Sequence, residues 1–235
     1  MSQARNGRVV FCHTRDATIH LCTAPPPRDR SIADAERRGS TDHLDAVLAR
    51  LAGAQGGAVG RMQLLADGIG ERGIDRRLAS GHLHILMLAG RPLKGVYAVG
   101  RARLDGLRGW RWAASLACGP ESVISDRAAA DVQDLISSSR LEVSIPPGAR
   151  RRRAGITVHR RALQPQDVTT VDGLRVTAWP RTVLDVAAVE PTKRLALALD
   201  RTVTLRIFDL NAMEDLLERH PRAHGRRPCE RRSRR

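Results

Sequence analysis

The chain has 235 residues, a formal net charge of +15 and 42% apolar residues, so it can form at least one hydrophobic core. No run approaches the roughly 20 apolar residues that cross a bilayer, and the first residues do not resemble a signal peptide. The four cysteines are too few and too scattered for a disulfide framework. We therefore expect a soluble, cytoplasmic protein that does not bind a membrane.

The positive charge is carried almost entirely by arginine, since only Lys94 and Lys193 are lysines. About half of the excess lies in residues 219–235, where eight arginines accompany one glutamate. The remaining charge is compatible with nucleic-acid binding but does not demonstrate it.

Residues 1–41 show no sustained periodicity and contain three consecutive prolines, so we predict a disordered extension there. Cys12, His13, His20 and Cys22 are all zinc-ligand types, but the cysteines lack the two-to-four-residue spacing of a zinc knuckle. We interpret this set as a coincidence and expect neither a metal nor a cofactor.

Three helices are predicted next. Leu44, Val47, Leu48 and Leu51 have the spacing of an amphipathic helix, with Asp42 as its N-cap and Gly53 near its end. A short helix follows, with Met62, Leu64 and Leu65 apolar, and stops at Asp67-Gly68. A third runs over about 71–80 and ends at Gly81.

Two strands are predicted after the helices, over 83–88 and 96–99, with a turn at Gly90-Arg91-Pro92 between them. Three helices followed by two strands are typical of a winged helix-turn-helix. We therefore predict a DNA-binding domain of this kind over 42–100.

The third helix carries the candidate DNA-binding residues. Its apolar residues face the bundle, which leaves five polar side chains pointing outward: Arg72, Asp75, Arg76, Arg77 and Ser80. Arginine can read base edges and bind phosphates with one planar fork. Arg91 and Lys94 lie in the predicted loop between the strands, where a wing meets the DNA backbone. The alternative is that these are ordinary solvated surface charges.

Residues 101–220 predict a mixed α+β domain. Helices are expected at about 106–118, at about 126–136 with Ser125 as N-cap, from Pro180 onward, at about 192–203, and at about 209–219 with Asp209 as N-cap. Strands are expected around 141–145 and 156–158, and Asp172-Gly173 indicates a hairpin. The arginine-rich residues 221–235 are predicted to be a disordered tail.

No catalytic set emerges from the sequence, so we expect no enzymatic activity. Asp131, Gln133 and Asp134 superficially resemble a nuclease motif, but they lie on a predicted helix and are interpreted as a solvated face. His159 is interpreted as a surface strand residue, with nucleic-acid contact as the alternative. Cys118 is expected in the core.

Two further charged groups have structural interpretations. Arg181 and Asp185 are spaced to pair along one helix. Residues 150–153, four consecutive arginines, are expected to form a basic loop between strands, and phosphate binding is the alternative.

Several segments resemble the AbiEi-type abortive-infection antitoxins, a family abundant in actinobacteria. Residues 44–100, with Gly81–His84 and Gly95–Gly100, resemble its N-terminal winged helix. The second domain of the family is matched by the segments Trp112–Ala114, Ala117–Pro120, Gly155–Arg160 and Val176–Asp185, together with Ser125. The resemblance covers about 44–220, and its most specific segment is Val176–Asp185.

The resemblance implies the antitoxin of a type IV toxin–antitoxin pair involved in phage defence. Such a protein would bind double-stranded DNA at an inverted repeat in its own promoter as a transcriptional regulator, either as a homodimer or as two cooperative monomers. It would counter a nucleotidyltransferase-like toxin without forming a stable complex with it.

The sequence departs from the family in three places. Residues 85–93 make a longer, more apolar wing, residues 131–139 replace a common segment, and an arginine-rich tail replaces the endonuclease-like domain that some relatives carry. Two alternatives therefore remain: a truncated remnant of an endonuclease-fused relative, and a protein-interaction module that does not bind DNA.

Overall fold

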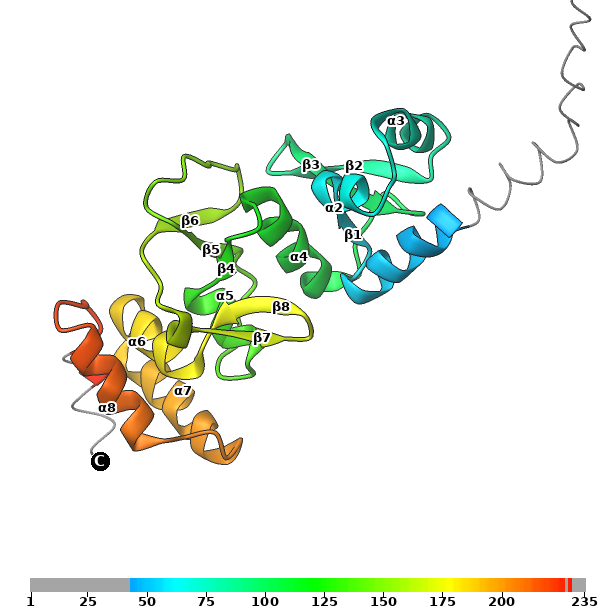
Figure 1. Cartoon of the computed structure of the whole chain (residues 1–235). Helices are drawn as coiled ribbons and strands as arrows, with labels where there is room; N and C mark the ends of the chain where they lie inside the picture. Colours follow the sequence, from blue (N-terminus) through cyan, green and yellow to red (C-terminus); the bar gives the residue numbers. More distant parts are fainter. Residues whose placement is uncertain (1–42, 227, 230–235) are drawn as a thin grey trace, which may run out of the picture. The chain divides into compact units, whose positions relative to one another are not determined.

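The computed structural model describes residues 43–226, 228 and 229 (Figure 1). The described residues from Leu44 onward form one compact unit. Its described part contains two β-sheets and a set of helices, so the predicted α+β class is confirmed. The predictions for residues 1–41, for Asp42 and for the Cys12–Cys22 set lie outside the described residues.

The first half of the unit builds a three-stranded antiparallel sheet with helices against it. The elements in chain order are helix 43–54, β1 (Ala58–Gly60), α2 (Arg61–Ala66), α3 (Glu71–Ala79), β2 (Leu83–Leu88) and β3 (Arg91–Val99). The strand order is β1-β3-β2. β1 was not predicted, because three residues in a glycine-rich segment are too short to show a strand periodicity.

The β2–β3 hairpin is tighter than predicted. Its turn is Ala89-Gly90, whose φ angles of 49° and 71° fit the two-residue type I′ turn that suits the twist of a hairpin. The expected turn at Gly90-Arg91-Pro92 is therefore wrong, and Arg91 and Lys94 lie within β3 instead of in a loop. Pro92 has no backbone N–H to donate. It is tolerated because β1 pairs with β3 only at Val96–Ala98, so one side of β3 is an open edge at Pro92.

Both faces of the first sheet are covered. Along β1 and β3, Val59 and Tyr97 face helix 43–54, α2 and α3, while Ala58, Val96 and Ala98 face the opposite way. That opposite face packs on α4 (Gly106–Cys118), whose predicted bounds are confirmed. The hydrophobic core therefore continues past residue 100, where the sequence predicted a domain boundary.

The second sheet has five strands in the order β6-β5-β4-β8-β7. The strands are β4 (Val123–Ile124), β5 (Glu142–Ile145), β6 (Thr157–Arg160), β7 (Val168–Val171) and β8 (Leu174–Thr177). The β5–β6 and β4–β8 pairs are parallel and the others antiparallel. The predicted Asp172-Gly173 hairpin is confirmed, whereas α5 (Asp126–Val132) ends before the predicted residue 136.

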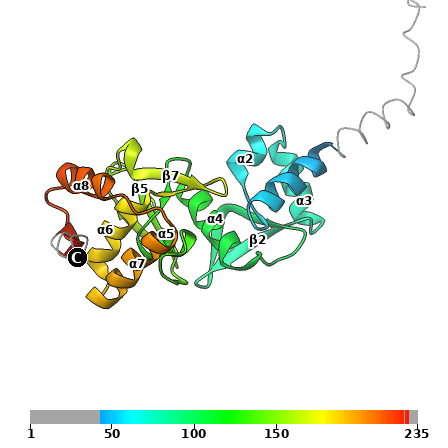
Figure 2. The ribbon, with the colours of Figure 1, turned by 90° about the horizontal axis from the view of Figure 1, so that it is seen from below.

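Three helices complete the unit, α6 (Trp179–Val189), α7 (Thr192–Thr204) and α8 (Leu210–Arg219). They pack together at the end of the unit remote from α2 and α3 (Figure 2). Asp209 caps α8 as predicted, because its carboxylate accepts hydrogen bonds from the N–H groups of Asn211 and Ala212. No helix among the described residues is both long enough and apolar enough to cross a bilayer.

Residues 221–226, 228 and 229 pack against the helices, contrary to the disordered tail predicted from residue 221, and the rest of that predicted tail lies outside the described residues. Cys229 is fully buried, with its Sγ 3.6 Å from Sδ of Met213. Gly225 approaches α6 so closely that a Cβ there would overlap the carbonyl oxygen of Leu184 and lie 3.0 Å from the amide nitrogen of Ala188. The sequence shows no hydrophobic periodicity here because the packing depends on single small residues.

Candidate nucleic-acid interface

Helix α3 presents most of its predicted side chains to solvent. It begins at Glu71 and ends at Ala79, with Gly81 after it in the left-handed region that terminates helices. Ile74 is fully buried against the bundle. Arg72, Asp75, Arg76 and Ser80 are exposed as predicted.

Arg77 is the exception, and its predicted outward position is wrong. It is 8% exposed, and its Nη2 lies 2.7 Å from Oδ1 of Asp45. Position 77 follows Ile74 by three residues and so lies on the buried face of the helix. The long arginine stem packs there while the guanidinium reaches helix 43–54. Arg77 therefore fastens α3 to helix 43–54 and is not available to a ligand.

Arg72 and Arg76 make no contact with an acidic side chain in the described part of the chain. Neither belongs to any ion pair formed within residues 43–226, 228 and 229. Ser80 is exposed but its Oγ already bonds Nδ1 of His82 at 2.8 Å. The usable donors of α3 are therefore the guanidinium groups of Arg72 and Arg76.

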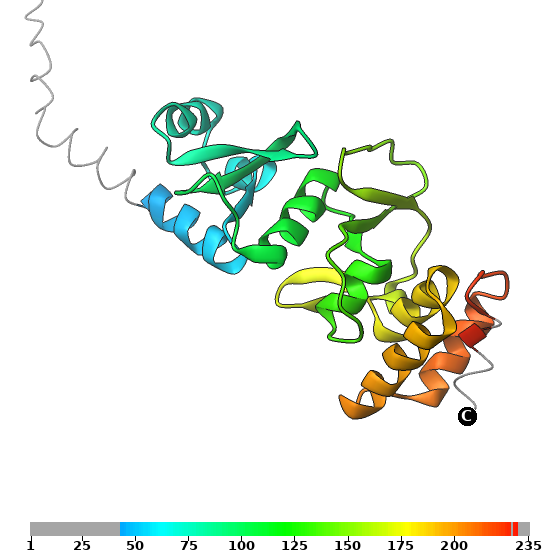
Figure 3. The same ribbon diagram turned by 180° about the vertical axis from the view of Figure 1, so that it is seen from behind.

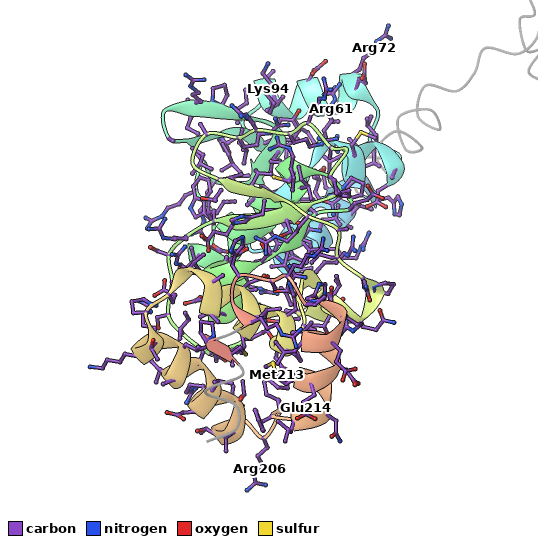
Figure 4. All side chains as sticks on the ribbon, turned by 90° about the vertical axis from the view of Figure 1, so that its left-hand side faces the viewer. Arg61, Arg72, Lys94, Arg206, Met213 and Glu214 are labelled. Carbon is purple, nitrogen blue, oxygen red and sulfur yellow. The ribbon has the colours of Figure 1, made fainter. Side chains whose placement is uncertain are left out.

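The β2–β3 hairpin lies next to α3, against which β2 packs. Arg91 and Lys94 are both exposed on β3. Between the Ile85–Tyr97 and Met87–Pro92 pairs, one residue of β2 faces four of β3, so Lys94 lies in a bulge. Arg72 and Lys94 lie at the same end of the molecule, and Arg206 lies at the opposite end (Figure 4).

A separate network of buried charges holds the second sheet to α5 and α6. Arg161, just beyond β6, lies 3.1 Å from Oδ2 of Asp126 and 2.7 Å from Oδ1 of Asp185. The predicted pairing of Arg181 with Asp185 is confirmed, with a nitrogen–oxygen distance of 3.0 Å. His159 lies within this network, 3.3 Å from Asp126. These contacts cross-link three elements and give each of the charges a structural role.

Asp167, at the end of the 3-10 turn Pro165–Asp167, belongs to a second such network. It is fully buried and accepts bonds from Nη1 of Arg219 at 2.6 Å and from the N–H of Gln164. Arg219 bonds Oδ1, whereas the Gln164 N–H bonds Oδ2, which His220 and Arg181 also approach. Burial alone would raise the pKa of Asp167, but the bonds from Arg219 and Gln164 and the nearby positive charges outweigh it and lower that pKa.

The pKa of Asp185 predicts how the free energy of unfolding changes with pH. Burial raises its pKa to about 6, with Arg181 and Arg161 opposing the shift and Asp126 adding to it. An unfolded aspartate has a pKa of about 3.9. Between about pH 4 and pH 6 the folded state therefore binds more protons, so this group lowers the free energy of unfolding as the pH rises.

The measurement is urea unfolding of the wild type and of Asp185→Asn across this pH range. We expect the stability of the wild type relative to Asp185→Asn to fall as the pH rises from about 4 to about 6, and to stay level above that. A stability difference that does not change with pH would contradict this assignment.

Asp131 and Cys118, which were considered as possible catalytic residues, have structural roles instead. Asp131 pairs with Arg111 and accepts the N–H of Ser138 at 2.7 Å, so it does not lie on a solvated face. Burial raises the pKa of the Cys118 thiol to about 11, which keeps it protonated at neutral pH. The described residues contain no group of three or more histidine, cysteine, aspartate or glutamate side chains placed to hold a metal ion.

Searches against protein-family models and against curated proteins gave no match to this chain. The geometry of α3 and the β2–β3 hairpin is therefore the main basis for a functional assignment.

Proposed function

We propose that the protein is a DNA-binding antitoxin and transcriptional autoregulator of a type IV toxin–antitoxin system. The observation that carries the DNA-binding part is the pair of exposed arginines on α3, Arg72 and Arg76, beside a hairpin that exposes Arg91 and Lys94. Arginine forks of this kind bind guanine edges and backbone phosphates.

The order of elements over residues 43–99 supports a winged helix-turn-helix. In such a domain the second helix of the helix-turn-helix enters the major groove, and the hairpin beside it contacts the backbone or the minor groove. Here α2 and α3 would form the helix-turn-helix and β2–β3 the wing. The Arg77–Asp45 pair would keep α3 in place when DNA binds.

The antitoxic part of the proposal is supported by the resemblance of residues 44–220 to AbiEi-type antitoxins. On this basis the DNA ligand is the promoter of its own gene, bound at an inverted repeat by two copies of the chain. The toxin would be a nucleotidyltransferase-like protein that the antitoxin opposes without a stable complex.

The DNA-binding part is tested with the double variant Arg72→Gln/Arg76→Gln. We expect its affinity for the DNA directly upstream of the gene to fall by about 1–3 kcal/mol for each bidentate arginine–base pairing that the substitution removes. The variant should remain folded, because both side chains are exposed and neither makes an ion pair within the described residues. Fluorescence anisotropy with a labelled duplex, at one fixed salt concentration, measures the change.

Two controls make this experiment decisive. Arg206→Asn removes one exposed positive charge at the opposite end of the molecule, and asparagine suits the left-handed backbone of that position. Its affinity should equal that of the wild type. An unrelated duplex should bind more weakly than the upstream DNA. Equal binding by the wild type and by Arg72→Gln/Arg76→Gln would show that α3 is not the helix that contacts the bases.

A second candidate function is a protein-interaction module, favoured by apolar side chains exposed on and after α7. These are Leu197, Val203, Leu205, Ile207 and Leu210, between 38% and 60% exposed. Exposed apolar groups in one region mark protein-binding surfaces. Tight, salt-independent binding of a protein, with no affinity for duplex DNA, would favour this candidate over the first.

A further inference from the structure

A groove runs between the β2–β3 hairpin and the loop that joins β5 to β6, with a volume of about 230 Å³. Leu88 and Arg91–Lys94 of the hairpin form one wall, and Arg152–Ala154 of the loop form the other. The tip of the hairpin and this loop lie side by side in the views from the front and from behind (Figures 1 and 3).

The loop wall is held firmly against the hairpin. Gly155, with a φ of +77°, packs so closely that a Cβ there would lie 2.7 Å from Cγ of Leu88. Ile156 is buried in the core that the first sheet shares with α4. Arg160 donates to the carbonyl oxygens of Ala149 and Arg151 at 3.1 and 3.3 Å. The two walls therefore keep their spacing without a ligand.

The groove concentrates positive charge that the described residues do not neutralise. Arg91, Lys94, Arg152 and Arg153 line it, and its lining contains no carboxylate from the described part of the chain. None of the four joins any ion pair within residues 43–226, 228 and 229, whereas Arg61, Arg77, Arg111, Arg127, Arg161, Arg181 and Arg219 all do.

One donor in the groove is already shielded from water. Nε of Arg153 is buried and has no hydrogen-bond partner among the described residues, while Nη1 of the same side chain donates to the carbonyl oxygen of Arg152. A buried donor without an acceptor is costly, and a turn of the Arg153 side chain toward the groove would bring this nitrogen to an anion bound there. Arg151 does not line the groove. Its guanidinium packs against Gly119 at the end of α4, about 3.3 Å from where a Cβ on that residue would lie.

We propose that this groove binds backbone phosphates of the same DNA duplex that α3 contacts, which makes the Arg152–Arg153 loop a second DNA contact outside the winged helix. This inference rests on the proposed DNA-binding function. The hairpin places the groove beside the end of the molecule that carries Arg72 and Lys94 (Figure 4). No aromatic side chain of the described chain lines the groove, so it lacks the stacking surface that single-stranded nucleic acids use.

The test removes one charge from each wall with Arg91→Gln/Arg152→Gln in the full chain. Both side chains are exposed and neither makes a side-chain hydrogen bond within the described residues, so the fold should be retained. The probe is a labelled duplex of the DNA directly upstream of the gene, titrated at several salt concentrations. The slope of log K against log salt should become shallower by about 1.8, since each neutralised phosphate contributes about 0.9.

The matched control is Lys193→Gln/Arg206→Asn, which also removes two exposed charges, one in the first turn of α7 and one just beyond its last residue. Its slope should equal the wild-type slope. If the Arg91→Gln/Arg152→Gln slope is also unchanged while Arg72→Gln/Arg76→Gln still weakens binding, the groove inference is overturned and the proposed function stands. If the wild type does not bind the duplex at all, both are overturned. If the groove variant loses affinity for single-stranded RNA and not for the duplex, the groove serves another ligand and the inference is wrong.

Discussion

Replacing Arg161 with methionine is expected to lower the free energy of unfolding at neutral pH by about 3–5 kcal/mol, because it leaves two buried carboxylates without their shared cation. Asp126 and Asp185 are 2% and 6% exposed, and Arg161 contacts both. Methionine keeps much of the length of the side chain and removes the charge and the donors. Urea unfolding at neutral pH measures the change in stability.

The neighbouring substitution Arg160→Met is the matched control. Arg160 is exposed and its described hydrogen bonds go to backbone carbonyl groups, so its replacement should cost less than about 1 kcal/mol. The cost of Arg161→Met should also shrink as the pH falls below about 6, because protonation of Asp185 removes one of the two negative charges that Arg161 neutralises. Equal destabilisation of the two variants would show that Arg161 does not neutralise this pair.

Replacing Gly109 with alanine is expected to destabilise the protein by about 3 kcal/mol, at the upper end of the range for overpacking. Gly109 lies at the point where α4 crosses the turn that contains Gly56. A Cβ would overlap the carbonyl oxygen of Gly56 and lie 2.9 Å from Cβ of Leu104. The obstacle is largely backbone, so no side-chain rotation can relieve it, and α4 must move away from the first sheet.

Gly53→Ala provides the comparison within a helix of the same protein. Gly53 lies in helix 43–54 and has no described atom within 4 Å of a Cβ position. Alanine there should leave the stability unchanged or raise it by up to about 1 kcal/mol. Thermal unfolding of both variants separates the steric effect from helix propensity, and a stable Gly109→Ala protein would rule out the close crossing.

Elements with a local signal were the ones that the sequence could predict. The Asp209 cap, the helical spacing of α4 and the Asp172-Gly173 turn depend on residues near one another in the chain, and all are confirmed. α5 stops early for a tertiary reason. The Gln133 side chain bonds the Thr177 carbonyl oxygen and the Thr182 hydroxyl, and the next residue takes a left-handed φ of 56°.

The candidate site shows the same division. The outward positions of Arg72 and Arg76 follow from the spacing of apolar residues in one helix. The position of Arg77 on the buried face also follows from its spacing from Ile74, but its partner Asp45 belongs to another helix and no spacing rule identifies it. Arg152 and Arg153 were visible as a basic run, but their place beside Arg91 and Lys94 depends on the packing of Gly155 on Leu88.

The two covered faces of the first sheet limit how α3 could be exchanged for a helix of another protein. A fragment that ends at residue 100 would carry Ala58, Val96 and Ala98 as an uncovered apolar surface, because α4 supplies their contacts. A chimaera that replaces α3 should therefore take α4 with it, or change only the exposed side chains of α3. Under the proposed function, single substitutions at the exposed positions of α3 are, by the same reasoning, the easier evolutionary route to a new DNA sequence.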